Sequence, residues 1–212
     1  FGSSMVEYGL GKGAFYGSSI EVVDLSSCVD LVELQESTFN NCKMLKEVIL
    51  PEQGKLSTLG HNLFVNCDSL SEISLPNTIT TLKERDSFCN TFLNCNALEE
   101  IVLPDSIVSS PRYIIKQCAN IRKVTLPKFF TSINAYDYIM DCKNLEEVVL
   151  PLFSYTNNNN EDIVVNTTLN RRAPYCFIET KCTNFAKYTL RLDDNNKIMI
   201  EENGILYKNG VL

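Results

Sequence analysis

The stretch FNNCKMLKEVILP, residues 39–51, decides the fold, because its pattern recurs along the chain. The pattern consists of a Phe, a Cys, a Leu, a Val or Ile and a Leu-Pro pair at fixed offsets. It returns at residues 64–76, 92–104, 115–127 and 139–151. From copy to copy, the Cys and the Leu-Pro pair advance by the same steps of 25, 28, 23 and 24 residues. Five copies in one register indicate an array of structural repeats.

The pattern continues in weaker form on both sides of these five copies. Residues 15–26 hold a shorter copy without Cys, and residues 182–192 keep the spacing with Phe185 in the Leu position and Tyr188 in the Val position. Atypical repeats are expected at the ends of an array, where they shield an otherwise open core. We therefore count about seven repeats of 23–28 residues.

Each repeat predicts one short strand. Near the end of the pattern, apolar residues occupy alternate positions, which is the period of a strand with one buried face. The Pro that follows ends the strand because it lacks a backbone donor. A single repeat cannot bury its apolar face, whereas stacked repeats form a parallel sheet with strands about 4.8 Å apart. The sequence predicts a right-handed, open solenoid of α/β or mainly β class, with a parallel sheet on one face.

The in-register Cys residues are expected to face the core as free thiols. Stacked side chains point in parallel, so their Cβ atoms remain about 5 Å apart, whereas a disulfide requires about 3.5–4.5 Å. The chain contains nine Cys, one His and no Cys-x-x-Cys, which argues against a zinc site. This column consists of Cys42, Cys67, Cys95, Cys118 and Cys142.

Three Cys residues lie outside the column: Cys28, Cys89 and Cys176. The last two each precede a Cys of the repeat pattern by six positions. Local disulfides from Cys89 to Cys95 and from Cys176 to Cys182 therefore remain an alternative to free thiols at these positions.

Composition and charge exclude several classes of partner. The 212 residues carry a formal charge of −7 and a pI near 4.8, which argues against nucleic acid and against an anionic membrane surface. No apolar run approaches the length of a membrane span, so we expect no membrane insertion. The start, FGSSMVEYGL, lacks an initiator Met and the layout of a signal peptide, so we expect a fragment or a processed form.

The sequence contains no constellation that predicts catalysis, a metal or a cofactor. The lone His61 falls in a repeat turn and is expected to be exposed or hydrogen-bonded there. GLGKG, residues 9–13, lacks the order of a phosphate-binding loop and is expected to form a turn. Paired glutamates such as Glu99-Glu100 and Glu146-Glu147 recur with the repeat, which favours a solvated strand face over acid–base chemistry. We predict that the protein is not an enzyme.

The repeated unit F-x-x-C-x-x-L-x-x-[VI]-x-L-P resembles that of the BspA-like leucine-rich repeat family. The resemblance covers residues 15–192, with an insertion at about 152–175, and two copies depart from it by having Ile115 and Ile139 at the Phe position. Members of this family are surface or secreted proteins of bacteria and protists associated with adhesion. The resemblance therefore implies a leucine-rich-repeat solenoid and an extracellular or cell-surface location.

The last residues of the chain are predicted to form a separate small unit. The segment IMIEENGILYKNGVL resembles the hairpin that family members place beside their arrays, and it contains two Asn-Gly pairs that favour tight turns. We expect a repeat array over residues 1–192 and a β-hairpin or meander over residues 193–212. The Asn run at 157–160 is expected to be a solvated loop in the insertion.

The outward face of the sheet is the candidate ligand surface. Strand alternation places there the residues on either side of the motif Val or Ile, forming one row rich in Glu and one with several apolar residues. The apolar members have two explanations: β-propensity alone, or a mildly apolar, acid-rimmed strip that binds a partner. The candidate residues are Glu47, Ile49, Glu72, Ser74, Glu100, Val102, Lys123, Thr125, Glu147 and Val149.

Two functions follow from these expectations. The first is a non-catalytic binding or adhesion module that recognises a protein or carbohydrate ligand through the surface of the array. The second is a structural spacer or assembly component of a larger surface protein. The two differ over the sheet face, which a binding module needs and a spacer does not.

Overall fold

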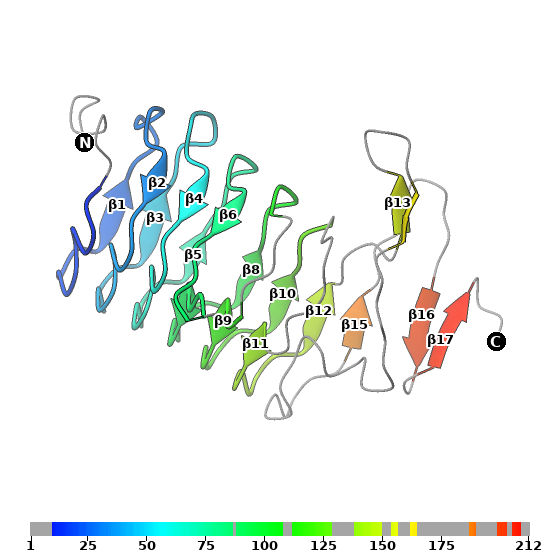
Figure 1. Cartoon of the computed structure of the whole chain (residues 1–212). Coiled ribbons are helices and arrows are strands. Elements are labelled where there is room, and N and C mark those ends of the chain that lie inside the picture. The colour runs from blue at the N-terminus through cyan, green and yellow to red at the C-terminus, as the bar shows by residue number, and fades with distance from the viewer. Residues whose placement is uncertain are drawn as a thin grey trace.

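The computed structural model describes residues 10–86, 88–107, 112–128 and 138–149, together with the backbone of five short strands farther along the chain. Within this part the regular secondary structure is entirely β, with no helix. Successive turns of the chain stack beside one another in the order of the sequence (Figure 1). The predicted solenoid is thereby confirmed as a mainly β array.

One strand per repeat forms the parallel sheet on one face, with the residues of neighbouring strands in register. The sheet consists of two runs rather than one. The first has the order β1-β3-β5 and the second β15-β12-β10-β8, and no ladder joins β5 to β8. The strands are β1 (Val22–Asp24), β3 (Glu47–Ile49), β5 (Glu72–Ile73), β8 (Glu100–Val102), β10 (Lys123–Thr125), β12 (Glu147–Val149) and β15 (Lys187–Thr189).

The interruption falls within the longest repeat step, the 28 residues from Cys67 to Cys95. The interruption is confined to strands β5 and β8. The two turns that precede these strands are still joined by a hydrogen bond, in which the Ala97 amide donates to the Asp68 carbonyl at 3.1 Å. The segments that follow the two strands are joined as well, because the Ser106 hydroxyl donates to the Ile79 carbonyl. The predicted parallel sheet is therefore present with a local opening between its third and fourth strands.

Two further parallel ladders run along the other sides of the array. The first consists of β2 (Glu33–Leu34), β4 (Thr58–Leu59) and β6 (Thr81–Leu82). The second consists of β7 (Phe92–Leu93), β9 (Ile115–Lys116) and β11 (Ile139–Met140). Each turn thus contributes backbone hydrogen bonds on more than one side, and these hold the turns at a constant spacing.

Two antiparallel strand pairs lie outside the parallel ladders. Strand β13 (Ser154–Thr156) pairs with β14 (Asp162–Val164), within the region expected to be an insertion. Strand β16 (Met199–Glu202) pairs with β17 (Ile205–Lys208). The expected division into an array and a C-terminal segment stays a prediction.

The core consists of stacked equivalent side chains. Phe15, Phe39, Phe64 and Phe92 form a column in which neighbouring ring centroids are 5.3–5.4 Å apart and nearly parallel. Ile115 continues the column and is fully buried, so the departure from Phe preserves an apolar contact. Stacking of this kind explains why the first residue of the motif must be large and apolar.

The described Cys residues are buried free thiols, including the whole predicted column. Each thiol in the middle of the array donates to the carbonyl of the motif residue one turn earlier: Cys67 to Phe39 at 3.1 Å and Cys95 to Phe64 at 3.0 Å. Cys89 is also free, so the alternative disulfide to Cys95 is not formed. Cys176 and Cys182, the other possible pair, lie outside the described residues.

The residue before each column Cys has a left-handed backbone, a requirement that explains the recurring Asn. Asn66 has φ of 56° and Asn94 of 58°. Their side chains form a ladder: Asn94 Nδ2 donates to Asn66 Oδ1 and Asn66 Nδ2 to Asn41 Oδ1, both at 2.8 Å. Asn tolerates this conformation better than most residues, and its side-chain amide donates to the Asn of the preceding turn. This ladder was not predicted from the sequence.

Candidate functional site

The structure places the candidate residues in two rows on the sheet face. In the first, Glu47 lies opposite Glu72, and Lys123 lies between Glu100 and Glu147. In the second, Thr125 lies between Val102 and Val149. The exposed members are Glu47, Ile49, Glu72, Ser74, Glu100 and Val102, and the half-buried members are Lys123, Thr125, Glu147 and Val149.

The predicted row rich in Glu is not continuous along the sheet face. Glu72 and Glu100 belong to different runs of the sheet, because β5 and β8 do not pair. In the second run the charges alternate, and Lys123 Nζ lies 3.9 Å from Glu147 Oε2. In the first run Glu47 and Glu72 are adjacent and have the same charge. The negative charge of the face is therefore concentrated over β3 and β5.

A groove of about 750 Å³ lies at this acidic part of the face. It covers β3 and β5 and the turns that follow β1, β3 and β5. Its volume falls within the range of about 300–1,000 Å³ typical of ligand pockets. The lining residues are Ser26, Val29, Glu47, Val48, Ile49, Leu50, Glu52, Gln53, Glu72, Ile73, Ser74, Leu75, Pro76 and Asn77.

Ile73 contributes a partly exposed apolar side chain to the lining of the groove. It occupies the motif position at which Val48, Ile101 and Val124 are at most 2% exposed, yet it is only half-buried. Strand β5 has no partner strand on the side of β8. The lining of the groove therefore includes a side chain at a core position that is half-buried rather than fully buried.

One wall of the groove depends on a glycine. Gly54 has φ of +136°, and a Cβ at this position would lie 2.4 Å from the Val29 carbonyl oxygen. The turn therefore approaches Val29 closely, and the Lys55 amide donates to the same oxygen at 2.8 Å. Only glycine permits both this conformation and this approach. The sequence pattern, which repeats without Gly54, gave no signal of this wall.

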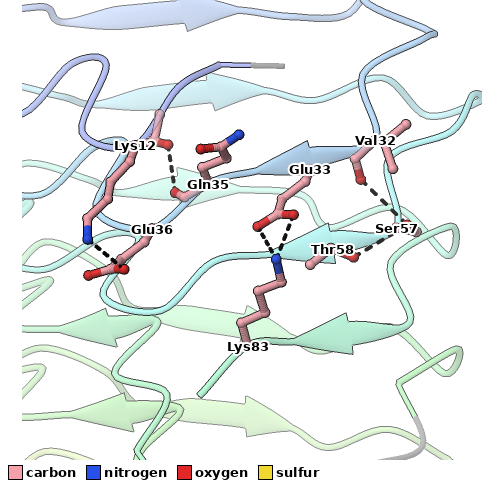
Figure 2. Close-up of polar contacts among 9 residues, drawn as sticks. Lys12, Val32, Glu33, Gln35, Glu36, Ser57, Thr58 and Lys83 are labelled. Atoms are coloured by element: carbon pink, nitrogen blue, oxygen red, sulfur yellow. Dashed lines mark hydrogen bonds and ion pairs between the residues drawn. The ribbon is translucent and has the colours of Figure 1, made fainter. Parts of the chain in front are cut away.

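A second, smaller hollow of about 380 Å³ lies beside strands β2, β4 and β6 and is lined largely by charged side chains. Figure 2 shows Lys83 reaching past β4 to Glu33, with 2.7 Å between Nζ and the carboxylate oxygens. Glu36 accepts from Lys12 at 2.9 Å and from Arg85 at 3.3 Å. The hydrogen bond from Lys12 holds the pKa of Glu36 below its ordinary value. These opposite charges neutralise one another.

His61 borders this second hollow but is oriented by the backbone. It is 9% exposed, and its Nδ1 lies 2.8 Å from the Phe88 carbonyl oxygen, to which it donates. The expected hydrogen-bonded turn residue is confirmed. Among the residues that the structure describes, no group of three metal-ligating side chains comes together. In the same residues, no helical segment has the length and apolarity needed to cross a bilayer.

The stacked turns, with one short parallel strand, an apolar column and a Leu-Pro corner in each repeat, define a leucine-rich-repeat solenoid. The family model described as BspA type leucine rich repeat region matches the chain in six copies, over residues 8–91 and 88–153. Because the match extends over more than half of the sequence, the chain belongs to this family. No curated protein matches the sequence.

Solved structures of leucine-rich repeat proteins share the fold. A leucine-rich repeat protein from Bacteroides ovatus ATCC 8483 has 22% identity and a TM-score of 0.57, covering 68% of this chain and 35% of that chain. A leucine rich cell surface protein from Faecalibacterium prausnitzii A2-165 has 18% identity and a TM-score of 0.60, covering 93% and 45%. The pneumococcal vaccine antigen PcpA has 19% identity and a TM-score of 0.60, covering 82% and 37%. This chain thus spans less than half the length of each.

Proposed function

We propose that this chain is a non-catalytic binding module that recognises a protein or glycan through the sheet face of its repeat array. The groove over β3 and β5 is the observation that carries the proposal. It combines exposed carboxylates with apolar side chains on a rigid support, because backbone ladders fix the spacing of the turns. Rows of side chains held in this way lose little conformational entropy when a partner binds.

The same proposal places the protein at the cell surface or outside the cell. It is supported by family membership and by two structural relatives, one described as a cell surface protein and one as a vaccine antigen. An adhesive role is consistent with that location. A display surface of this kind needs exposed, chemically varied side chains rather than a catalytic centre, and the sheet face provides them.

A binding role fits the site better than an enzymatic one. His61 is the single histidine of the chain, and it is nearly buried and hydrogen-bonded to a carbonyl. Burial raises the pKa of the Cys67 thiol to about 12 and that of Cys89 to about 11, so neither is suited to act as a nucleophile at neutral pH. Glu33 and Glu36 form ion pairs. We therefore propose that the protein has no catalytic activity.

The alternative function, a spacer within a larger surface protein, makes a different prediction about the groove. The experiment is a binding screen of the full chain against extracellular proteins and a glycan array. Any partner found is then tested with Glu72→Lys, which reverses a charge in the groove, and with Glu84→Lys as a matched control. Both residues are exposed, and both substitutions change the net charge equally.

We expect Glu72→Lys to weaken binding at least about fivefold, because an electrostatic partner of the groove would then face a repulsive charge. Glu84→Lys should leave the affinity within about twofold. A partner that both variants bind like the wild type would exclude the groove. A chain that binds nothing in the screen would favour the spacer.

A further inference from the structure

The groove over β3 and β5 is acidic and has no balancing cation in its lining. Its charged residues are Glu47, Glu52 and Glu72, and no Lys, Arg or His is among them. The lysines nearest in sequence are engaged elsewhere: Lys46 pairs with Glu21 and Lys55 with Asp30, both at 2.7 Å. The groove therefore presents three carboxylates to whatever enters it.

The groove also has an apolar component, which separates it from an ordinary acidic patch. Ile73 is half-buried, and the apolar side chains of Val29 and Ile49 also line the groove. Val29 is 48% exposed and Ile49 is 36% exposed. A ligand that fills the groove must match carboxylates and apolar side chains within the same short span.

We propose that this groove binds an extended, basic segment of a protein partner, with Lys or Arg side chains at the glutamates and an apolar side chain against Ile73. The proposal rests on the proposed function and specifies the chemistry of its partner. An extended segment turns neighbouring side chains to opposite sides. In a segment of alternating basic and apolar residues, the basic side chains can therefore contact the glutamates of the groove while the apolar side chains contact Ile73.

A peptide fits this groove better than a glycan does. The lining contains no Phe, Tyr or Trp on which a sugar ring could stack. Acidic glycans would be repelled by Glu47, Glu52 and Glu72. Neutral glycans would leave these carboxylates without a cation and would gain nothing from Ile73. A basic segment satisfies the carboxylates and also buries apolar surface, so charge and shape favour the same ligand.

The probe is a fluorescein-labelled pentapeptide with the sequence Lys-Leu-Lys-Leu-Lys, and fluorescence anisotropy with the full chain measures its binding. Glu-Leu-Glu-Leu-Glu tests the charge, and Lys-Ser-Lys-Ser-Lys tests the apolar contribution. We expect the Lys-Leu peptide to bind most tightly. Its affinity should fall at least about fivefold when salt rises from about 50 to about 300 mM, because exposed ion pairs are screened.

The structure provides a matched pair of variants. Glu47→Gln/Glu72→Gln removes two of the three carboxylates of the groove. Glu100→Gln/Glu147→Gln removes the equivalent row from the second run, where Lys123 already neutralises Glu147. We expect the first variant to weaken binding of the Lys-Leu peptide at least about fivefold and the second to change it less than about twofold. Circular dichroism and thermal unfolding confirm that both remain folded.

Three results would overturn the proposal: no binding of the Lys-Leu peptide, equal affinity for the Glu-Leu peptide, or equal loss in both variants. Displacement of the peptide by a neutral oligosaccharide such as maltopentaose would indicate a glycan site instead. The proposed function and the groove assignment can be tested apart. If a natural partner binds through Glu100 and Glu147 but not through Glu47 and Glu72, the module binds through its sheet face and the groove assignment alone is wrong.

Discussion

Asn66 donates its side-chain amide to the side-chain oxygen of Asn41, one turn earlier, at 2.8 Å. It accepts the same bond from Asn94 of the next turn at 2.8 Å, so it lies at the centre of a ladder through three turns. All three residues have left-handed backbones. A single residue type therefore meets a backbone requirement and a side-chain requirement at the same position.

Substitution of Asn66 can separate these two requirements. Asn66→Gly keeps the left-handed backbone and loses two hydrogen bonds, so we expect a loss of about 1–2 kcal/mol in the free energy of unfolding. Asn66→Ala loses the same bonds and adds the left-handed penalty, for a total of about 2–4 kcal/mol. Urea unfolding measures both. A Gly variant no more stable than the Ala variant would show that the backbone conformation is not limiting.

Truncation within the aromatic column should be severe. Phe64 is fully buried between the rings of Phe39 and Phe92, at centroid distances of 5.3 and 5.4 Å. Phe64→Ala should lower the free energy of unfolding by about 3–5 kcal/mol, as expected for a buried aromatic side chain. Met44→Ala is the control, because Met44 is 47% exposed. A loss below about 1 kcal/mol at Phe64 would contradict the stacked core.

Gly54 offers a test of the groove wall with a control in the same chain. Gly54→Ala places a Cβ against the Val29 carbonyl and in a disfavoured backbone region, so we expect a loss of about 1–3 kcal/mol. Gly11→Ala should change stability by less than about 0.5 kcal/mol, because a Cβ there meets no atom within 4 Å. Thermal unfolding compares the two. Equal effects would argue against the close approach of this turn.

The buried Cys67 thiol predicts a loss of stability at high pH. Burial raises its pKa from 9.0 to about 12, so the native thiol stays protonated after the unfolded thiol has ionised. The free energy of unfolding should therefore fall between about pH 9 and 12, by up to about 1.4 kcal/mol per pH unit from this group. Below pH 9 its contribution is fully present.

Cys67→Ala isolates this effect from other titrating groups. Its absolute stability falls through lost packing, but its loss of stability per pH unit above pH 9 should be smaller than that of the wild type. Between pH 6 and 8 the two proteins should have the same slope, which serves as the internal control. Parallel curves across the whole range would show that the native thiol ionises as readily as the unfolded one.

The period of the repeat made most of the fold predictable. Alternation correctly placed Val48 inside and Ile49 outside, and the shared spacing placed equivalent strands in register. The accessibility of Ile73 was not predictable, because its repeat carries the same pattern as its neighbours and the opening depends on how two turns pack. The pair of Glu33 with Lys83 was also missed. These residues are 50 positions apart and meet across an intervening strand.

The choice between the sheet face and the Asn run at 157–160 is the remaining prediction for function. We expect a partner found with the full chain to bind the face, because its side chains are held by stacked strands, whereas ordering a loop costs about 1–2 kcal/mol per residue. Inserted loops also carry recognition in many proteins, so the expectation needs a direct test.

Two variants make that test. One reverses the acidic charges of the face with Glu47→Lys, Glu72→Lys and Glu100→Lys. The other replaces residues 157–160 with a Gly-Ser sequence of equal length, so that the connection between β13 and β14 keeps its number of residues. Charge reversal should reduce affinity at least about tenfold, since Glu47 and Glu72 of the groove then repel a partner that they attracted. The Gly-Ser variant should bind within about twofold. If the replacement abolishes binding and charge reversal leaves it intact, the insertion is the binding site and the sheet face serves as its support.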